Sequence, residues 1–393
     1  MAKEVFILGG KRTPMGEYVG ALKDVSAIDL GVIAARGALQ ATGVKPEEID
    51  HAVIGNALQT SGDAIYGARH VALKAGVPYQ RPALTVNRLC GSGIQAIVSG
   101  AQMIQLNEAS TCLVGGMESM SQAPHVIRGA RSGFALGQGT LEDSLMVALL
   151  DTYCNTPMAG TAENLARKFE ISREEQDQYA LRSQQEAKRA QDSGYLAQEI
   201  VPVEVKTRKG SLLVERDDHL RSETTLEGLA KLRPAFTRDG FVTAGNASGI
   251  VDGAAALVIA DEQFAKSRDL TPMGRIVSWA YAGVEPETMG IGPVPATQSA
   301  LEKAGLTLAQ IDLVEVNEAF AAQYLAVEKE LGLDRSRTNV NGGAIALGHP
   351  LGATGTRLVL TVLHELHRRS GRYGLATACI GGGQGIAMVV ERL

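Results

Sequence analysis

The sequence predicts an α/β protein made of two similar halves, each with a mixed sheet, and a polar segment inserted between them. Three observations support this prediction: strand-like runs alternate with helical patterns, a motif recurs far along the chain, and the intervening segment differs in composition. Strands that alternate with helices favour a sheet buried between helical layers. The 393 residues, 45% of them apolar, suffice for two or three domains with a large core.

The alternation is clearest in the first third of the chain. Short runs at 52–54, 83–86 and 111–114 have the composition of buried strands, and helical patterns occupy 65–75 and 94–106 between them. Such an order is typical of sheets that are parallel or mixed and covered on both faces.

An internal repeat divides the chain. Residues 43–57 resemble residues 305–319 at a constant offset of 262, since 305 − 43 = 262. Each copy reads as a helix end, an Ile-Asp turn, a buried strand and a turn that contains Asn. Two further matches follow in the same order, 85–87 with 339–341 and 112–116 with 379–383. The repeat predicts two halves that pack as a pseudo-twofold pair.

The predicted domains follow from this repeat. The first half spans 1–120 and is completed by about 246–270, the inserted loop domain spans 121–245, and the second half spans 271–393. The insertion contains a charged helical pattern from Thr161 to about Asp192 and basic residues between Arg221 and Arg233. A polar insertion on a duplicated scaffold is suited to serve as a lid or a substrate platform.

Charge and cysteine content exclude several classes of protein. A net charge of −5 has the wrong sign for a protein that neutralises nucleic-acid phosphates. The four cysteines are scattered and lack C-x-x-C spacing, which argues against a disulfide framework and a structural zinc site. The longest apolar stretch, 254–260, is too short to span a bilayer. We therefore expect an intracellular protein with no metal, nucleic-acid or membrane partner.

Cys90 is the first candidate for chemistry. It follows a strand-like run and precedes an amphipathic helical pattern, so its sulfur is expected near a helix N-terminus, where the thiolate is favoured. The alternative is an inert buried cysteine. The glycine pattern at 91–96 also resembles a dinucleotide fingerprint, but Glu108 comes too early for the ribose-binding acid.

Three further motifs stand near expected strand or helix ends. His349 lies among glycines before Pro350, which suits a first helical turn, so the helix dipole is expected to lower its basicity. Cys379 precedes a glycine run whose backbone amides are free to face a developing oxyanion. Asn317 follows a buried strand and offers an uncharged donor. We expect these residues to meet Cys90 at one site.

The segments around Cys90, 317–321, 348–350 and 379–383 resemble those of the thiolase family, and the resemblance covers essentially the whole chain. It implies a thiolase-like fold whose loop domain is a coenzyme A platform, in a homotetramer built as a dimer of dimers. It implies an acyl-CoA:acetyl-CoA C-acyltransferase that cleaves 3-ketoacyl-CoA or runs the reverse Claisen condensation. Coenzyme A would be a co-substrate, with no permanently bound cofactor, in the cytoplasm or an organellar matrix.

The resemblance also implies a role for each residue. Cys90 would hold the acyl group as a thioester, and Cys379 would take and return the proton of the acetyl methyl group. His349 and a water held by Asn317 would stabilise the enolate oxygen. The amides of Cys90 and Gly381 would form a second oxyanion hole. The positions that match substrate or coenzyme A contacts are Met158, Arg221, Thr224, Ala244, Ser248, Ala319 and Phe320.

The residue before Met158 bears on the substrate. Acetoacetyl-specific members typically carry His-Met there, and this chain has Pro157 instead, as in the mitochondrial type that accepts longer 3-ketoacyl chains. An acetoacetyl-CoA-specific acetyltransferase remains the alternative. A ketoacyl-synthase-like enzyme would pair its cysteine with two His or with His and Asn, and Cys379 argues against it. A non-enzymatic acyl-CoA carrier would lack a reactive residue, and none is missing.

Overall fold

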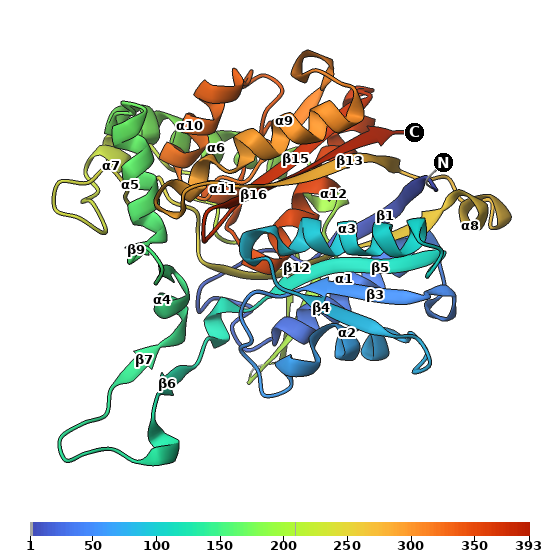
Figure 1. Ribbon diagram of the computed structural model, residues 1–393, viewed down its shortest axis with the longest axis horizontal. Coiled ribbons are helices and arrows are strands. Elements are labelled where there is room, and N and C mark those ends of the chain that lie inside the picture. The colour runs from blue at the N-terminus through green and yellow to red at the C-terminus, as the bar shows by residue number, and fades with distance from the viewer. Residues whose placement is uncertain (1–2, 209) are drawn as a thin grey trace.

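The computed structural model describes residues 3–208 and 210–393, and its centre is a single ten-stranded sheet flanked by helices (Figure 1). Its strands are β1 (Val5–Arg12), β2 (Gly16–Glu17), β3 (His51–Gly55), β4 (Ala83–Val86), β5 (Thr111–Glu118), β12 (Val251–Asp261), β13 (Gly274–Gly283), β14 (Leu313–Val316), β15 (Tyr373–Ile380) and β16 (Gln384–Arg392). Their order is β14-β15-β16-β13-β1-β12-β5-β3-β4, and β2 pairs with β12.

The two ends of this sheet are built alike. β3 pairs in parallel with β5 at one end, and β14 pairs in parallel with β15 at the other. The start of β14 lies 262 residues after that of β3 (313 − 51), and the start of β15 lies 262 after that of β5 (373 − 111). The halves meet where β1 and β13 pair antiparallel. The predicted α/β class and the two related halves are confirmed.

The third sequence match, of residues 112–116 with 379–383, is wrong in register. His51 pairs with Cys112 in the first half, and Leu313, 262 residues later, pairs with Gly374 in the second. Gly374 is therefore the structural counterpart of Cys112, and the counterpart of Cys379 is Met117 (379 − 262 = 117). β5 and β15 are both buried along nearly their whole length, so their apolar composition does not distinguish the correct register from the predicted one.

Helices α1 (Ala27–Thr42), α2 (Gly67–Ala75) and α3 (Ser92–Gln105) belong to the first half, and α9 (Pro293–Ala304), α10 (Ala321–Leu331), α11 (Ala344–Leu347) and α12 (Leu351–Arg369) belong to the second. The short α8 (Glu262–Ser267) follows β12. α3 and α12 pack closely because each has a glycine at the contact. A Cβ on Gly93 would lie 2.4 Å from Thr356 N, and one on Gly355 would lie 2.5 Å from Ile94 N. This contact brings the starts of the two helices together.

The insertion between β5 and β12 contains four helices and three small hairpins within its described residues: α4 (Ser144–Ala148), α5 (Met158–Lys168), α6 (Arg173–Asp192), α7 (Leu226–Ala230), β6 (His125–Ile127) with β7 (Leu141–Asp143), β8 (Leu150–Asp151) with β9 (Thr156–Pro157), and β10 (Val203–Thr207) with β11 (Gly210–Val214). The single helix expected from Thr161 to about Asp192 is wrong. Glu170 takes a φ of 51°, and Ser172 with Glu175 forms a capping box that begins a new helix.

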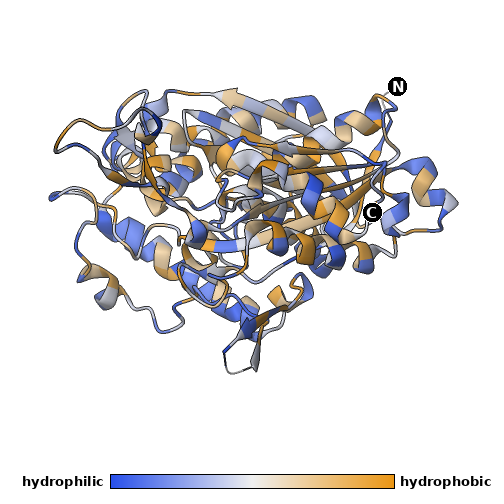
Figure 2. Ribbon diagram, turned by 90° about the horizontal axis from the view of Figure 1, so that it is seen from below, coloured by the Kyte–Doolittle hydropathy of each residue, from blue (hydrophilic) through white to orange (hydrophobic). Residues whose placement is uncertain are grey.

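Arg12 links the sheet to the insertion through two ion pairs. Its buried guanidinium lies 2.7 Å from Glu199 and 2.6 Å from Asp217, both in the insertion. Figure 2 shows that the strands through the middle of the molecule are mainly hydrophobic, and every residue of β12 is buried. In the described part of the chain, no helix has both the length and the apolar character needed to cross a membrane.

Candidate active site

Cys90 lies in a short turn, Leu89–Gly91, between β4 and α3. Leu89 takes a φ of 47°, a left-handed conformation that costs a residue other than glycine about 1–3 kcal/mol of conformational energy. Two hydrogen bonds hold it there: its amide donates to Asn87 Oδ1 at 2.9 Å, and Ser92 Oγ donates to its carbonyl at 2.7 Å. The turn directs Cys90 into a cavity that Leu89 and Gly381 also line.

The thiol of Cys90 is less acidic than the sequence suggested. Burial raises its pKa to about 11, the amide of Gly381 donates to the sulfur and opposes this rise, and the charge of Glu118 adds to it. The raised pKa runs against the expectation that a helix N-terminus would favour the thiolate, and burial is its largest cause. The hydrogen bond does bring the predicted pair, Cys90 and Gly381, together.

Cys379 is fully buried near the end of β15. Burial raises the pKa of its thiol well above the ordinary value, and the charge of Cys90 raises it further. Two groups that interact electrostatically in this way are neighbours in the site. Cys379 also packs in a small apolar cluster with Met289, Ala319 and Phe320. A thiol this hard to ionise gains a proton readily once it has lost one.

His349 and Asn317 form a buried polar pair. The Nδ2 atom of Asn317 lies 3.3 Å from His349 Nε2, and the other ring nitrogen, Nδ1, lies 2.6 Å from Thr354 Oγ1. The pKa of His349 is lowered to about 3 by burial, with a smaller effect from Arg357. The predicted direction is right, but burial rather than the helix dipole is the main cause. Among the described residues, the Asn317 Oδ1 atom has no hydrogen-bond partner although it is buried.

Two adjoining cavities connect these groups. One of about 210 Å³ is lined by Cys90, Gly381 and neighbouring residues, and another of about 260 Å³ is lined by His349, Ser248 and Phe320 among others. Leu149, Met158 and Leu351 border both. The larger cavity is mostly apolar, with Met120, Met146, Phe236 and Ile250 in its wall. An acyl chain beside a reactive thiol is the kind of ligand that this space suits.

The predicted coenzyme A contacts divide into two groups. Met158, Ser248 and Phe320 line the larger cavity, and Ala319 is buried beneath it, where its carbonyl accepts from Ser248 N at 3.0 Å.

Arg221 and Ala244 are exposed, and Thr224 is half-buried. Arg221 pairs with Glu17, and Thr224 Oγ1 donates to the Arg221 carbonyl at 2.7 Å. His219, two residues before Arg221, lies against the wall of the larger cavity, since a Cβ on Gly249 would lie 2.3 Å from its Nε2 atom.

Sequence reasoning missed several residues of the site. Leu149 and Leu351 border both cavities. Thr354 contacts His349, and the charge of Glu118 raises the pKa of Cys90. Only Glu118 had a local signal, because it is an acidic residue at the end of the apolar strand β5.

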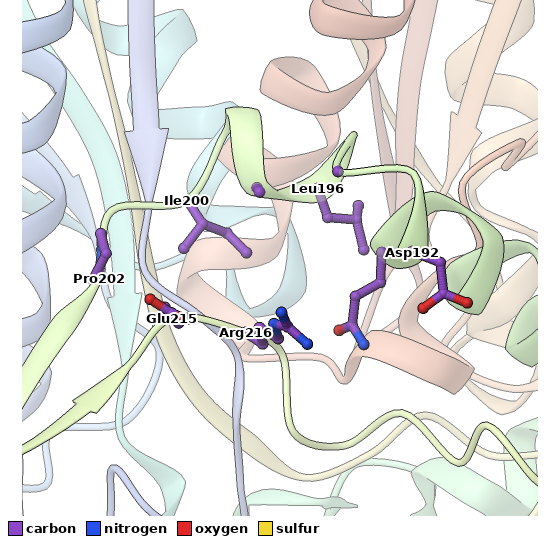
Figure 3. A pocket seen from close by; sticks show the side chains of 9 residues that line it. Asp192, Leu196, Ile200, Pro202, Glu215 and Arg216 are labelled. Atoms are coloured by element: carbon purple, nitrogen blue, oxygen red, sulfur yellow. The ribbon is translucent and has the colours of Figure 1, made fainter.

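A separate cavity of about 400 Å³ lies beyond the end of α6 (Figure 3). Asp192, Leu196, Glu215 and Arg216 line it with other residues, and the predicted site residues lie elsewhere. Among the described residues, no group of three or more His, Cys, Asp or Glu side chains is arranged to hold a metal ion.

Comparisons with known proteins agree with this geometry. The profile described as thiolase, N-terminal domain, matches residues 5–263, and that described as thiolase, C-terminal domain, matches 270–392. The chain is 57% identical over 392 residues to the mitochondrial 3-ketoacyl-CoA thiolase of Homo sapiens, covering 100% of this chain and 99% of the relative. It is 49% identical over 390 residues to the acetyl-CoA acetyltransferase of Rhizobium meliloti, covering 99% of both.

A solved structure extends the likeness to three dimensions. The crystal structure of human mitochondrial 3-ketoacyl-CoA thiolase matches with a TM-score of 0.98 at 57% identity, covering 100% of this chain and 99% of that one. The same human enzyme in complex with CoA matches with a TM-score of 0.97. The chain therefore belongs to the thiolase family of acyltransferases.

Proposed function

We propose that this thiolase cleaves 3-ketoacyl-CoA with coenzyme A, and runs the reverse Claisen condensation, through an acyl thioester on Cys90. The observation that carries the proposal is that the Cys90 thiol, which lines a cavity and accepts from the Gly381 amide, is the neighbour of the buried Cys379 thiol. The 3-ketoacyl-CoA thiolase and acetyl-CoA acetyltransferase named among its relatives support this activity.

In the cleavage direction, the Cys90 sulfur adds to the 3-keto carbon after its proton has passed to a base, for which neutral His349 is the candidate. The oxyanion faces the Cys90 and Gly381 amides. The C2–C3 bond then breaks, and the electron pair moves onto the thioester as an enolate beside His349 and Asn317.

Cys379 supplies a proton to C2, which releases acetyl-CoA. The thiol of a second coenzyme A gives its proton to the Cys379 thiolate and attacks the Cys90 thioester, and the Cys90 thiolate that leaves takes back the proton held by His349. The shortened acyl-CoA leaves with both cysteines restored. The high pKa of Cys379 fits a group that must also remove a proton from a methyl carbon in the condensation direction.

We propose that the substrate range extends beyond acetoacetyl-CoA. Pro157 stands where acetoacetyl-specific members carry His, and Met146, Leu149 and Phe236 give the larger cavity an apolar wall. The acetyl-CoA acetyltransferase among the relatives keeps the acetoacetyl-specific alternative open. Thiolysis rates measured from C4 to C16 3-ketoacyl-CoA decide between them. Activity confined to C4 would contradict the broader range, and no activity at any length would contradict the function itself.

Coenzyme A is proposed as a co-substrate held by the inserted segment, which would act as its platform. Arg221 and Thr224 on the surface and Ser248 at the cavity wall are the proposed contacts, with Ala244 beside them. A human relative solved in complex with CoA, at 56% identity, supports this proposal.

A homotetramer, assembled as a dimer of dimers, is our proposal for the quaternary structure. The β6–β7 hairpin extends from the body (Figure 1), with Leu136 and Leu141 exposed on it. A second group of exposed apolar side chains lies near the sheet edge: Leu84 on the edge strand β4, Tyr79 in the loop before it, and Ile65 in the turn before α2. Exposed apolar patches are typical of surfaces that bind another protein chain. Light scattering on L136D/L141D and L84D variants tests both surfaces separately, and a monomeric parent protein would contradict the proposal.

We propose the cytoplasm or an organellar matrix as the compartment. Several relatives are named mitochondrial, which supports the matrix. Fractionation of the cells that make the protein distinguishes the two compartments.

A further inference from the structure

Glu118 is a completely buried carboxylate at the end of β5. Four donors converge on it. Asn56 Nδ2 and Leu58 N donate to Oε1 at 2.8 and 3.0 Å, and Ala57 N and Gly352 N donate to Oε2 at 3.1 and 2.9 Å. Three donors belong to the loop after β3 in the first half, and Gly352 belongs to α12 in the second half. One side chain therefore joins the halves at the site.

Glu118 is not part of an ion pair. Across residues 3–208 and 210–393, no lysine, arginine or histidine lies within salt-bridge distance of it, so hydrogen bonds alone stabilise its charge. Burial raises its pKa to about 7, the backbone amides oppose that rise, and the charge of Asp252 adds to it. Protonation would put a hydroxyl hydrogen against an N–H group, so the four-donor arrangement requires the anion.

On the nucleophile side, hydrogen bonds lead from Glu118 to the Cys90 turn. Ala57 donates to Glu118 and accepts from Asn87 Nδ2 at 3.1 Å through its own carbonyl. Asn87 Oδ1 in turn accepts from Leu89 N at 2.9 Å. Leu89 is the residue with the left-handed φ of 47°, and it directly precedes Cys90. The contacts that hold this conformation thus extend back to Glu118.

On the histidine side, the link is short. Gly352 is the second residue of α12, three positions after His349. The helix start is pressed against the end of β5, since a Cβ on Gly352 would lie 2.6 Å from the Met117 carbonyl oxygen. A glycine is needed for this approach, and the Glu118 carboxylate fixes its direction by accepting from the Gly352 amide.

We propose that Glu118 is a positioning residue, which holds the Cys90 turn and the His349 loop in register across the two halves without contacting the substrate. This inference rests on the proposed function of Cys90 and His349. A displacement of reacting groups by about 1 Å is enough to cost roughly 100-fold in rate. Loss of the carboxylate therefore slows acyl transfer to Cys90 while coenzyme A binding by the inserted segment stays unchanged.

The decisive experiment compares Glu118→Gln with Asp261→Asn. Asp261 is also a buried carboxylate that accepts a backbone amide, from Phe264 at 2.8 Å, but it lies at the opposite end of β12. Both variants replace a carboxylate by its amide and are expected to lower the melting temperature. Only Glu118→Gln is expected to slow Cys90 acylation by acetyl-CoA, by about 10- to 100-fold, with KM for coenzyme A within twofold of the parent. Equal acylation rates in the two variants would overturn the inference.

A second variant keeps the test valid if Glu118→Gln does not fold. Asn87 is exposed, so Asn87→Ala removes the link between Ala57 and Leu89 without opening the core. Its acylation rate is expected to fall about tenfold at unchanged melting temperature. An unaltered rate would overturn the inference. The parent enzyme is measured first. An inactive parent would contradict the proposed function, and with it the positioning role that rests on that function.

The pH profile gives a readout that a purely structural role would not change. The titratable groups that interact with Glu118 are Asp252 on β12 and Cys90 in its turn. As pH falls through about 7, protonation of Glu118 disrupts the four-donor arrangement, and the acylation rate of the parent falls. Glu118→Gln is expected to lack this step. The same step in both proteins would assign it to another group and count against the inference.

Discussion

Thr354 forms a hydrogen bond with the imidazole of His349: its hydroxyl oxygen lies 2.6 Å from Nδ1. The same hydroxyl lies 3.1 Å from the Pro350 carbonyl. When the hydroxyl donates to that carbonyl, it accepts from Nδ1–H, and Nε2 then accepts from the Asn317 amide. When the hydroxyl donates to Nδ1 instead, Nε2 carries the proton and can donate to an enolate oxygen. Thr354 therefore allows the ring to exchange tautomers while it stays neutral.

Thr354→Val is expected to lower kcat for thiolysis by about 10- to 100-fold, because the ring loses the partner that fixes its orientation. Valine keeps the shape of the side chain and removes only the hydroxyl. Thr354→Ser keeps the hydroxyl and is expected to retain most of the activity. Steady-state rates on acetoacetyl-CoA for the two variants provide the measurement. Comparable losses in both variants would show that the hydroxyl alone does not account for the effect, and full activity in Thr354→Val would contradict the role of the hydroxyl.

Cys90 is expected to carry the acyl group. After brief mixing with acetyl-CoA and acid quenching, peptide mass spectrometry should find an acetyl adduct on the Cys90 peptide, as its position in the cavity beside Gly381 requires. Cys90→Ser supplies the control, in which the adduct is absent or much slower. An adduct found only on Cys379 would reverse the two roles.

Cys379→Ser is expected to form the acetyl enzyme and to lose carbon–carbon chemistry. Removal of a proton-transfer group typically costs about 100- to 10,000-fold. The test compares the rate of Cys90 acetylation with the rate of acetoacetyl-CoA thiolysis in the same variant. If both rates fell by the same factor, Cys379 would be needed for the shape of the site rather than for the proton.

The alkylation of Cys90 should depend steeply on pH. Only the thiolate reacts with iodoacetamide, and the thiol pKa in the folded enzyme is about 11. The rate should therefore rise about tenfold for each pH unit between 7 and 10 and show no plateau there. The unfolded enzyme, with ordinary thiols of pKa about 8.5, should level off near pH 9. A plateau near neutral pH in the folded enzyme would indicate a thiolate stabilised by its surroundings.

Arg221→Ala is expected to raise KM for acyl-CoA by roughly fivefold, about 1 kcal/mol, with kcat nearly unchanged. Coenzyme A carries several phosphate charges, the protein as a whole is acidic, and Arg221 is exposed two residues after His219, which lies against the cavity wall. The effect should shrink at high ionic strength, which already weakens the contact in the parent. Arg233→Ala, an exposed arginine of the same stretch, is the matched control. An equal KM change in both variants would reduce the effect to general surface charge.

The sequence predicted the class of fold because the two halves repeat their local signals. Gly43 and Gly305 end helices in the left-handed conformation, 262 residues apart, and a short turn and a buried strand follow each one. The interruption of the long charged helix was missed. It depends on the backbone conformation of Glu170 and on a capping box at Ser172, which a charge pattern does not reveal.

The positions of the candidate residues were easier to predict than their electrostatics. Cys90 follows the end of β4 and stands just before α3, and His349 stands just before α12, whose start packs against that of α3. Their pKa values depend on how far water is excluded, which is set by residues distant in sequence. Glu118 acts through hydrogen bonds that cross the halves, and Thr354 acts through the side chain of His349 five residues earlier; the order of residues along the chain does not reveal either contact.

The place of the insertion also governs how the chain can fold as it is made. β5 ends at Glu118, and its neighbour β12 does not begin until Val251, so the strand that closes the first half is synthesised long after the others. At typical ribosomal speeds this interval lasts roughly ten seconds. The Arg12 guanidinium likewise lacks its partners until Glu199 and Asp217 have been made, 187 and 205 residues later. A nascent chain therefore presents an unpaired β5 edge, which chaperones that recognise exposed strands would meet before the first half can close.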